Sequence, residues 1–480
     1  MGSGIVAEAS AALHIFFATL INPCVHLRQT DKMKKLFLMG VLGACAAFSE
    51  TAMAQTTITV FDTILYYDGY APVVSQPVPP GVIRHRNDLY ARQLSTQELQ
   101  SIGTNLSMTV TIKAACDNYD RIGNVNLALV PKGAATYNPD SVQRIEIGRY
   151  ITPFMNKNVK PDTVPYYYNI SNVAHLLKEP SVINNYDIWA ELEVFGVPYA
   201  AQTQVPGCSG RNDVFYGTLK FETDGSTGSD NSNVLIPLSF KKNLNNYDTT
   251  ATDTVGKTVR SITFDVPNNL TDAMFVLITS NHGANQGGEE YNRRNHFVYF
   301  DNNLIYSYKP GRTSCEPFRK YNTQGNGIYG SAPRTDAQWQ SFSNWCPGDV
   351  IDTRKISLGA VPAGSHTFKL AVPDAQFVGK EGYFPVSLYL QGKTSGILGV
   401  SETAEAVTAN VVVYPNPVTD MLHIKSGAAI KNVQVFDLLG RQVRNGATAQ
   451  VDLSGLQQGV YYVQVLLGNN QTVTRRVVKN

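Results

Sequence analysis

Alternation of apolar and polar residues is the feature that most constrains the fold of this chain. The clearest run holds Leu106, Met108, Val110 and Ile112 on one side and Ser107, Thr109, Thr111 and Lys113 on the other. The pattern recurs at 125–129, 262–266, 366–370 and 386–390. Such segments are typical of half-buried strands, and Gly, Asn and Pro turns separate them. Beyond residue 54 no long stretch has helical periodicity, so the pattern predicts an all-β fold of antiparallel β-sandwiches.

The composition agrees with an exported all-β protein. Hydrophobic residues make up 43% and charged residues 16% of the chain, with 38 Gly and 25 Tyr. The formal net charge of +2 argues against a nucleic-acid-binding protein, because no basic excess is present to neutralise phosphates. With 480 residues, the chain exceeds what one core usually holds, so two or three domains are expected.

The N-terminal segment predicts export. Met33-Lys34-Lys35 precedes an apolar run at 36–48 and the small-residue end Ala52-Met53-Ala54. This order is that of a secretory signal, with cleavage expected after Ala54. An earlier apolar run at 11–21 suggests that residues 1–32 are an upstream extension from a misplaced start. The alternative is a two-helix membrane anchor, although neither run reaches the ~18–20 residues that span a bilayer.

Four cysteines remain after such cleavage: Cys116, Cys208, Cys315 and Cys346. An even number in an exported chain predicts disulfides, and four cysteines allow three pairings. No two of them form a Cys-x-x-Cys pair, which argues against a zinc site. We expect no metal and no cofactor.

Two polar stretches predict domain boundaries. Residues 223–232, Thr-Asp-Gly-Ser-Thr-Gly-Ser-Asp-Asn-Ser, have nothing to bury and are expected to form a flexible linker. A second boundary is expected at 395–408. The predicted domains are therefore 55–228, 229–394 and 409–480, after an export segment at 1–54.

The C-terminal segment has the motifs of a small separate β-sandwich. These are Tyr414-Pro415-Asn416-Pro417, Phe436-Asp437-Leu438-Leu439-Gly440-Arg441, Gly459-Val460-Tyr461 and a basic end at 475–479. Their order resembles the type A sorting domain of the type IX secretion system. The resemblance implies a Gram-negative host, transport across the outer membrane, and loss of the tail with release or surface attachment. An ordinary carbohydrate-binding sandwich is the alternative.

Several short segments could carry chemistry. Cys116-Asp117-Asn118-Tyr119-Asp120-Arg121 ends an alternating strand; a solvated turn or a small calcium loop would have the same composition. In 186–193, Ile188, Ala190 and Leu192 occupy the core face, which leaves Asp187, Trp189, Glu191 and Glu193 on the opposite face. That face is either a wet exterior or one wall of a sugar cleft, and the cost of exposing Trp189 favours the cleft.

Two further segments lie in the second half. His282-Gly283 precedes Gly287-Gly288-Glu289-Glu290-Tyr291-Asn292-Arg293-Arg294, a glycine-rich loop with paired acids and paired arginines. A surface salt-bridge cluster would have the same composition. Ser343-Asn344-Trp345-Cys346-Pro347-Gly348 places a cysteine in a tight turn.

Taken in order, these segments resemble the peptide-N-glycosidase F family. The matching pieces are ACDNYDRIGNV, EIGRYITPF, the IWAEL strand, DVFYGT, NHG…GGEEYNRRNH and NWCPG, over residues 56–394. The resemblance implies two adjacent antiparallel jelly-roll β-sandwiches with the active site in the cleft between them. The small C-terminal sandwich would be the third domain.

The resemblance also implies roles for individual residues. The main catalytic carboxylate falls on Asp120, and the two assisting glutamates fall on Glu191 and Glu290. Arg121 falls on the family's sugar-contacting arginine and His282 on the histidine near the cleft. Trp189, Glu193 and Arg294 complete the expected substrate-binding set.

The implied reaction is hydrolysis of the amide that joins GlcNAc to asparagine. Water attacks, a glycosylamine leaves and asparagine becomes aspartate, with a general base taking a proton and donors supporting the oxyanion. Several carboxylates buried in one cleft differ in pKa, so that some are protonated and donate.

The chain departs from the family at several positions. Gly288 and Asn292 stand where the family has a short loop disulfide, and Gln340, Ser341 and Phe342 stand where it has a cleft arginine. Glu193 and Ser280 occupy aromatic positions. The resemblance implies a Cys315–Cys346 disulfide; Cys116 and Cys208 are then the remaining pair, although the family's partner for Cys116 is missing.

Two functions follow. The first is a secreted or outer-membrane-surface amidase, expected to be monomeric, that acts on N-linked glycoproteins or glycopeptides and is exported by type IX machinery. The second is a non-catalytic glycan-binding or adhesion protein on the same scaffold. Retention of three carboxylates favours the amidase.

Overall fold

The computed structural model describes residues 55–225, 234–284, 288–325, 328–330, 332–394, 411–437, 441–468 and 472–480, without the side chains of residues 181 and 472. The predicted export segment and the predicted linker at 395–408 lie outside the described residues. So do most of the linker at 223–232, Gly287, and Leu438 to Gly440 of the C-terminal motif.

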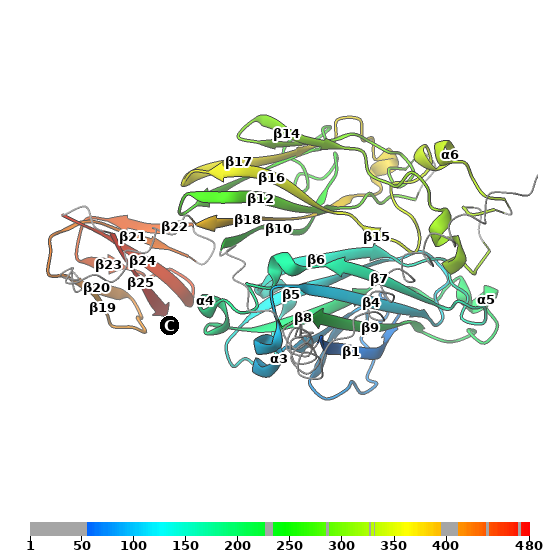
Figure 1. Cartoon of the computed structure of the whole chain (residues 1–480), viewed down its shortest axis with the longest axis horizontal. Coiled ribbons are helices and arrows are strands. Elements are labelled where there is room, and N and C mark those ends of the chain that lie inside the picture. Colours follow the sequence, from blue (N-terminus) through cyan, green and yellow to red (C-terminus); the bar gives the residue numbers. More distant parts are fainter. Residues whose placement is uncertain are drawn as a thin grey trace, which may run out of the picture. The chain divides into compact units, whose positions relative to one another are not determined.

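Two antiparallel sheets form the first half of the chain (Figure 1). The four-stranded sheet has the order β1 (Thr56–Tyr67), β9 (Asp213–Thr223), β4 (Leu106–Ala114) and β7 (Thr163–Asn169). The six-stranded sheet has the order β15 (Val350–Ile351), β6 (Gln143–Ile151), β5 (Ile122–Pro131), β8 (Tyr186–Val194), β3 (Leu89–Gln93) and β2 (Val82–Arg86).

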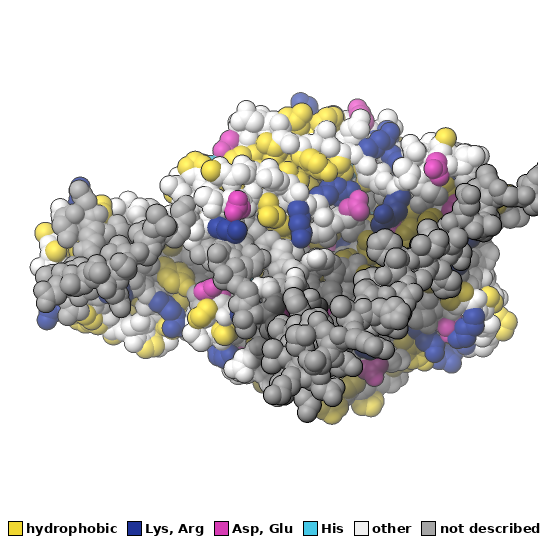
Figure 2. Space-filling view, in the orientation of Figure 1, with side chains coloured by type: hydrophobic (Ala, Val, Ile, Leu, Met, Phe, Trp, Pro, Cys, Tyr) yellow, Lys and Arg dark blue, Asp and Glu magenta, His cyan; other side chains and the backbone are white. Residues whose placement is uncertain are grey.

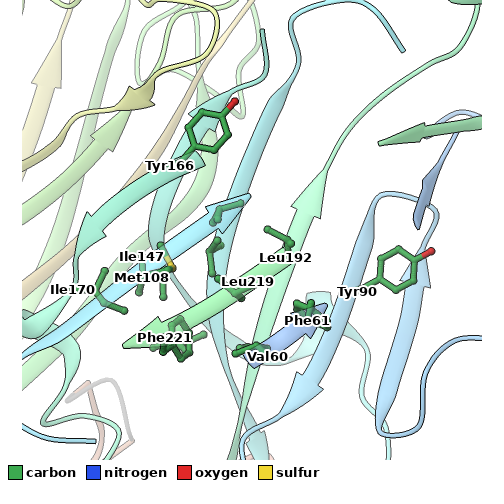
Figure 3. Packing of buried hydrophobic residues seen from close by; sticks show 14 of the residues in the cluster. Val60, Phe61, Tyr90, Met108, Ile147, Tyr166, Ile170, Leu192, Leu219 and Phe221 are labelled. Atoms are coloured by element: carbon green, nitrogen blue, oxygen red, sulfur yellow. The ribbon is translucent and has the colours of Figure 1, made fainter. Parts of the chain in front are cut away.

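The alternating residues of these strands build the core between the two sheets. Met108 of β4 and Leu219 and Phe221 of β9 come from one sheet, and Ile147 of β6 and Leu192 of β8 come from the other (Figure 3). All of them are almost fully buried. The predicted apolar core faces of 106–113 and 125–129 are thus confirmed, because both segments are strands whose apolar residues belong to this cluster. The segment at 125–129 is not half-buried as predicted, since Asn124 and Asn126 on its other face are buried as well.

A second pair of four-stranded sheets follows. One has the order β10 (Val234–Leu244), β18 (Phe384–Thr394), β12 (Leu270–Thr279) and β16 (Thr353–Val361). The other has the order β11 (Val259–Val266), β17 (Gly364–Ala371), β13 (His296–Phe300) and β14 (Asn303–Tyr308). Phe264, Phe368 and Leu388 come from the three segments that alternation predicted here, and they lie in one buried cluster.

One strand does not follow the predicted domain boundary between residues 228 and 229. Val350 and Ile351 form β15, which pairs with Tyr150 and Arg149 of β6 and so extends a sheet of the first half. Figure 1 shows β15 beside β6. The first core cluster also includes Val276 and Tyr389 of the second half. The two halves therefore share both a sheet and apolar packing.

Helices are short. They are α3 (Thr96–Ser101), α4 (Pro180–Ile183), α5 (Ala201–Gln204) and α6 (Asp336–Gln340), with 3-10 turns at Pro139–Ser141, Ser171–Val173, Glu316–Tyr321 and Val378–Lys380. Within the described residues, none is long and apolar enough to cross a membrane. The all-β prediction is confirmed.

The C-terminal segment has its own strands and core. A three-stranded sheet contains β19 (Val412–Tyr414), β20 (Met421–Lys425) and β23 (Gln450–Asp452). A four-stranded sheet contains β22 (Gln442–Gly446), β21 (Ile430–Phe436), β24 (Gly459–Leu467) and β25 (Thr472–Lys479). Leu422, Val435 and Val463 lie in a buried cluster that includes no residue of the first two cores.

Both expected disulfides are present. Cys116 pairs with Cys208 at a Cα–Cα distance of 5.5 Å, and Cys315 pairs with Cys346 at 5.4 Å. In Figure 2, acidic and basic side chains are interspersed on the part of this face that described residues occupy.

Candidate active site

Asp120 lies in the loop between β4 and β5, and Asp117 fixes the shape of that loop. The Asp117 carboxylate accepts hydrogen bonds from the backbone N–H groups of Tyr119 at 2.9 Å and Val197 at 2.7 Å. It also accepts from Nε of Arg121 at 2.6 Å. The Cys116–Cys208 disulfide ties the start of the loop to the segment after α5. Asp120 is therefore held on a rigid support.

Asp120 and Glu290 form a carboxyl pair across the two halves of the chain. Burial and the charge of nearby Glu290 raise the pKa of Asp120 to about 8, although Arg121 acts in the opposite direction. The Oδ2 atom of Asp120 is sealed from solvent and has no hydrogen-bond partner among the described residues. A carboxyl group in this state is mostly protonated at neutral pH and has one oxygen without a protein partner.

The loop that carries Glu290 is pinned by Asn344. The Asn344 side chain donates to the backbone oxygens of Glu289 at 2.7 Å, Glu290 at 2.8 Å and Asn292 at 3.0 Å. Burial raises the pKa of Glu290, whereas hydrogen bonds from the Tyr291 side chain and the Gly283 N–H lower it. The net direction is upward, so Glu290 also favours its protonated form more than an exposed glutamate does.

Glu191 belongs to a different group of contacts. It is fully buried on β8, where it accepts hydrogen bonds from the Tyr137 hydroxyl at 2.8 Å and from Nδ2 of Asn126 at 3.0 Å. Arg144 lies 3.6 Å away. The predicted position of Glu191 on the face of β8 opposite the core is confirmed, because Ile188, Ala190 and Leu192 line the first core. Among the described residues, the hydrogen bonds and ion pair of the Glu191 carboxylate involve Tyr137, Asn126 and Arg144 and not Asp120 or Glu290.

Glu193, two residues further along β8, connects this sheet to the second half. Its carboxylate is 2.7 Å from Nζ of Lys241 on β10 and 3.1 Å from Arg86 on β2. Burial raises the pKa of Glu193, but the charges of Lys241 and Arg86 outweigh it and hold the pKa below its ordinary value. Glu193 is therefore an anion at neutral pH.

His282 lies at the end of β12 beside a buried arginine. Its Nε2 is 2.7 Å from the Ser280 hydroxyl, whose oxygen accepts a hydrogen bond from Arg149 at 2.9 Å. Burial and the Arg149 charge lower the pKa of His282 to about 3. The imidazole is therefore neutral and can act as a hydrogen-bond partner without carrying charge.

The other predicted substrate contacts are engaged with protein groups. Arg121 is held by Asp117 and lies over the rings of Tyr119 and Phe195. Arg294 pairs with the buried Glu289 at 2.9 Å. Trp189 is 4% exposed and packs with Ala91, Ala128 and Val130 under the segment that carries Tyr137. The face of β8 expected to be a wet exterior or a cleft wall is covered at this position.

Two departures from the family have structural explanations. In place of the short loop disulfide, Nδ2 of Asn292 donates to the Gly288 carbonyl at 2.9 Å and closes the same turn. In the stretch without the cleft arginine, Phe342 packs against Tyr291 at 5.9 Å between ring centroids, and Arg334 lies over it. Phe342 therefore supports the residue that hydrogen-bonds Glu290.

Sequence reasoning missed several tyrosines near the carboxyl pair. The charge of Asp120 acts on both Tyr291 and Tyr329, and burial is the main cause that raises the pKa of each hydroxyl. Tyr383 lies close enough to Glu193 and Glu290 for their charges to act on it. Only Tyr291 had a signal in the sequence, its position next to Glu290; the others come from segments without a motif.

A cavity of about 330 Å³ lies beside the Asp120 loop. Asn118, Tyr119, Phe154, Gln204, Gln324 and Ile328 line it. None of these side chains carries a charge. The described residues contain no group of three or more His, Cys, Asp or Glu side chains arranged to hold a metal ion.

The arrangement suits proton transfer. Two carboxyl groups with raised pKa values lie close enough for their charges to interact. One is beside a phenol, and the other has an oxygen without a hydrogen-bond partner among the described residues. Pairs of this kind supply a base and an acid at near-neutral pH.

Family models agree with the fold and with the order of these segments. Residues 57–209 match the N-terminal domain and residues 246–391 the C-terminal domain of peptide-N-glycosidase F, and residues 412–480 match a secretion system C-terminal sorting domain. No curated protein sequence matches the chain.

Solved structures share the fold at low sequence identity. PNGF-II in one crystal form is 20% identical over 74% of this chain and 68% of its own, with a TM-score of 0.52. PNGF-II in a second crystal form is 19% identical over 74% of this chain and 67% of its own, with a TM-score of 0.51. PNGase F of Flavobacterium meningosepticum, described as a glycosylasparaginase, is 13% identical over 71% of this chain and 96% of its own, with a TM-score of 0.45.

The two matched domains together cover more than half of the chain, in the order that the sequence motifs indicated. The chain therefore belongs to the peptide-N-glycosidase F family and ends in a type IX secretion sorting domain, which marks it for export.

Proposed function

We propose that this protein is an amidase that hydrolyses the bond between GlcNAc and asparagine in N-linked glycoproteins or glycopeptides. The observation that carries the proposal is the Asp120–Glu290 carboxyl pair, in which the charge of one residue raises the pKa of the other. It occurs in a chain of the peptide-N-glycosidase F family. The resemblance of the sequence motifs to that family assigns its catalytic carboxylates to these residues.

Asp120 is the general base of the proposed reaction. Its ionised carboxylate takes a proton from water while the water oxygen forms a bond to the side-chain amide carbon of asparagine. Its Oδ2 suits this role, because within the described part of the chain no hydrogen bond to it has to break before water or substrate binds. The raised pKa makes the carboxylate a stronger base than an exposed aspartate.

The leaving nitrogen receives the proton that Asp120 took from water. The charge of Glu290 helps to hold that proton on Asp120, and the Tyr291 side chain orients Glu290 by a hydrogen bond. When the carbon–nitrogen bond breaks, the nitrogen takes this proton and leaves as a glycosylamine, while the former asparagine becomes aspartate. Tyr291 itself stays protonated, since burial and Glu290 raise its pKa.

The remaining residues position the substrate and the base. Arg121 is held by Asp117, and its charge acts to lower the pKa of Asp120. Glu193 and neutral His282 offer hydrogen-bond partners for sugar hydroxyl groups. Glu191, Trp189 and Arg294 are engaged in buried contacts, so their contribution is to hold β8 and the Glu290 loop in place.

Export determines where the reaction takes place. The sorting domain marks the chain for type IX secretion, so we propose that the tail is removed on export and that the enzyme acts in the medium or at the outer-membrane surface. Its partners are then N-linked glycoproteins or glycopeptides and the sorting machinery. We expect a monomer without a metal or cofactor.

Incubation of the purified protein with an N-glycopeptide in water enriched in heavy oxygen tests the proposal. Release of the glycan together with an aspartate peptide that carries one heavy oxygen supports hydrolysis of the amide. An intact glycopeptide that nevertheless binds the protein would indicate the non-catalytic glycan-binding alternative. Loss of the glycan with asparagine unchanged would indicate cleavage at a different bond.

A further inference from the structure

Two exposed tyrosines lie beside the candidate active site. Tyr70 is 73% exposed and Tyr383 is 38% exposed. Large aromatic side chains that stay in water next to a functional site are more often binding surfaces than chance exposures. Neither residue lies in a segment to which the function assigned above gives a role.

Tyr70 is held in place by a rigid turn after β1. Its backbone N–H donates to the Asp68 carboxylate at 3.0 Å, and the preceding Gly69 N–H donates to the Gly196 carbonyl at 2.9 Å. The Tyr70 ring stands edge-on to Phe195, with centroids 5.2 Å apart. A Cβ at Gly69 would lie 2.7 Å from the Phe195 ring, so glycine allows the turn to rest on that ring.

Tyr383 is fixed by an isolated antiparallel bridge to His282, a short distance beyond the end of β12. The two residues exchange backbone hydrogen bonds at 3.1 and 3.0 Å, and their rings are 5.7 Å apart. The Tyr383 hydroxyl is close enough to Tyr70, Glu193 and Glu290 for their charges to act on it. Through Phe195 and His282, the rings of Tyr70 and Tyr383 are thus held in the region of the acids of the site.

The surroundings of these rings suit a sugar better than an apolar side chain. One face of a pyranose carries C–H groups that lie well on the negative face of an aromatic ring, and its hydroxyl groups donate to carboxylates. Glu193 and Glu290 provide such acceptors. An apolar side chain would remove water from these carboxylates without replacing its hydrogen bonds, which is costly.

We propose that Tyr70, Phe195 and Tyr383 form an aromatic rim that stacks against sugar rings of the bound N-glycan. The proposal rests on the amidase function above and assigns it a glycan-contact surface. Phe195 supports the Tyr70 ring from behind, and Arg121 lies on Phe195 at 6.0 Å from its centroid. The rim therefore connects the glycan to the loop of Asp120.

Calorimetric titration of the full chain with a free oligosaccharide of mannose and N-acetylglucosamine tests the rim without requiring turnover. Tyr70→Ala and Tyr383→Ala are expected to weaken binding about two- to tenfold each, the range for one lost aromatic contact. Tyr383→Phe keeps the ring face and is expected to bind as the unchanged protein does. A parallel titration with an unglycosylated asparagine peptide is expected to show no difference among these proteins.

Two tyrosines of similar exposure provide matched controls. Tyr167 on β7 is 70% exposed and Tyr306 on β14 is 39% exposed. Tyr167→Ala and Tyr306→Ala are expected to leave oligosaccharide affinity unchanged. An unchanged affinity in both Tyr70→Ala and Tyr383→Ala overturns the rim, and so does a loss confined to the peptide, which would make the surface a polypeptide site.

The two proposals fail in different ways. A protein that releases no glycan but loses oligosaccharide affinity in the Tyr70 and Tyr383 variants contradicts the amidase and supports the rim. A protein that releases glycan while both variants bind normally contradicts the rim alone. No oligosaccharide binding at millimolar concentration by the unchanged protein also overturns the rim.

Discussion

At the scale of single residues, the site depends on a carboxyl group that stays protonated at neutral pH. Burial is the largest cause of the raised Asp120 pKa and the Glu290 charge is the second. Because the two carboxyls interact, their protons come off in steps that belong to the pair. A base with such a pKa is powerful once ionised but is ionised only in part of the population at neutral pH.

The rate of glycan release is expected to follow the ionisation of Asp120. With a pKa of about 8, the fraction of ionised base rises as the pH increases from 6 toward about 8. We therefore expect kcat/KM for a glycopeptide to rise over this range and to level off above it. A profile that falls through pH 8 would contradict the assignment, because it would make protonated Asp120 the active form.

Replacement of Glu290 is expected to shift this profile. Glu290→Gln removes the charge that raises the Asp120 pKa, so the rising limb should move to lower pH while the maximum rate falls. The control is Asp272→Asn, which removes an exposed carboxylate at the opposite end of β12 and should leave the limb in place. If the rate of the Glu290→Gln variant rises over the same pH range as that of the unchanged protein, the two carboxyl groups do not interact.

At the scale of elements, buried charges join the sheets of the two halves. Arg149 on β6 is fully buried, pairs with Glu146 at 2.7 Å, and donates to Ser280 and to the Pro385 carbonyl at 2.8 Å. Glu146 also accepts from Ser387 of β18. Such a network is satisfied only when both halves are in place, so it fixes their mutual arrangement.

Removing one partner of the Arg149–Glu146 pair should lower the free energy of unfolding more than removing both charges. Arg149→Met leaves Glu146 as an unpaired buried charge and is expected to lower the free energy of unfolding by about 3–5 kcal/mol. Adding Glu146→Gln should recover part of that loss, since no charge then remains unpaired. Urea unfolding of the single and double variants measures the coupling; strictly additive losses would show that the two residues act independently.

The disulfides should differ in their contribution to stability. Cys116–Cys208 bridges a sequence separation of 92 residues and Cys315–Cys346 one of 31. In the loop-entropy description, the longer loop stabilises by about 1 kcal/mol more at 25 °C. Paired Cys→Ser variants compared by denaturant unfolding should show this order. The opposite order would mean that strain or residual structure in the unfolded chain dominates.

Local pattern in the sequence predicted the elements well, because burial of one face of a strand imposes a period of two. It placed Ile188, Ala190 and Leu192 in the core and Glu191 off it, as observed. It could not show that a loop covers Trp189, since that contact joins distant segments. The approach of Asp120 to Glu290 was likewise available only through family resemblance, because 170 residues of chain separate them.

At the scale of the whole molecule, the sorting domain has a core of its own. None of its residues belongs to the clusters that hold Asp120 and Glu290 in place. A chain that ends at residue 394 is therefore expected to release glycan with kcat/KM within about twofold of the full chain, by the usual independence of distant sites. A large loss of activity on this truncation would show that the tail supports the site.

The central claim is that Asp120 is the base of an amidase, and the rate of glycan release by Asp120→Asn tests it most directly. Asparagine keeps the shape of the side chain but takes up no proton. We expect the rate of conversion of a glycosylated asparagine to aspartate to fall about 10²- to 10⁴-fold, with the unfolding transition retained. Glycan release at an undiminished rate by Asp120→Asn would contradict the account.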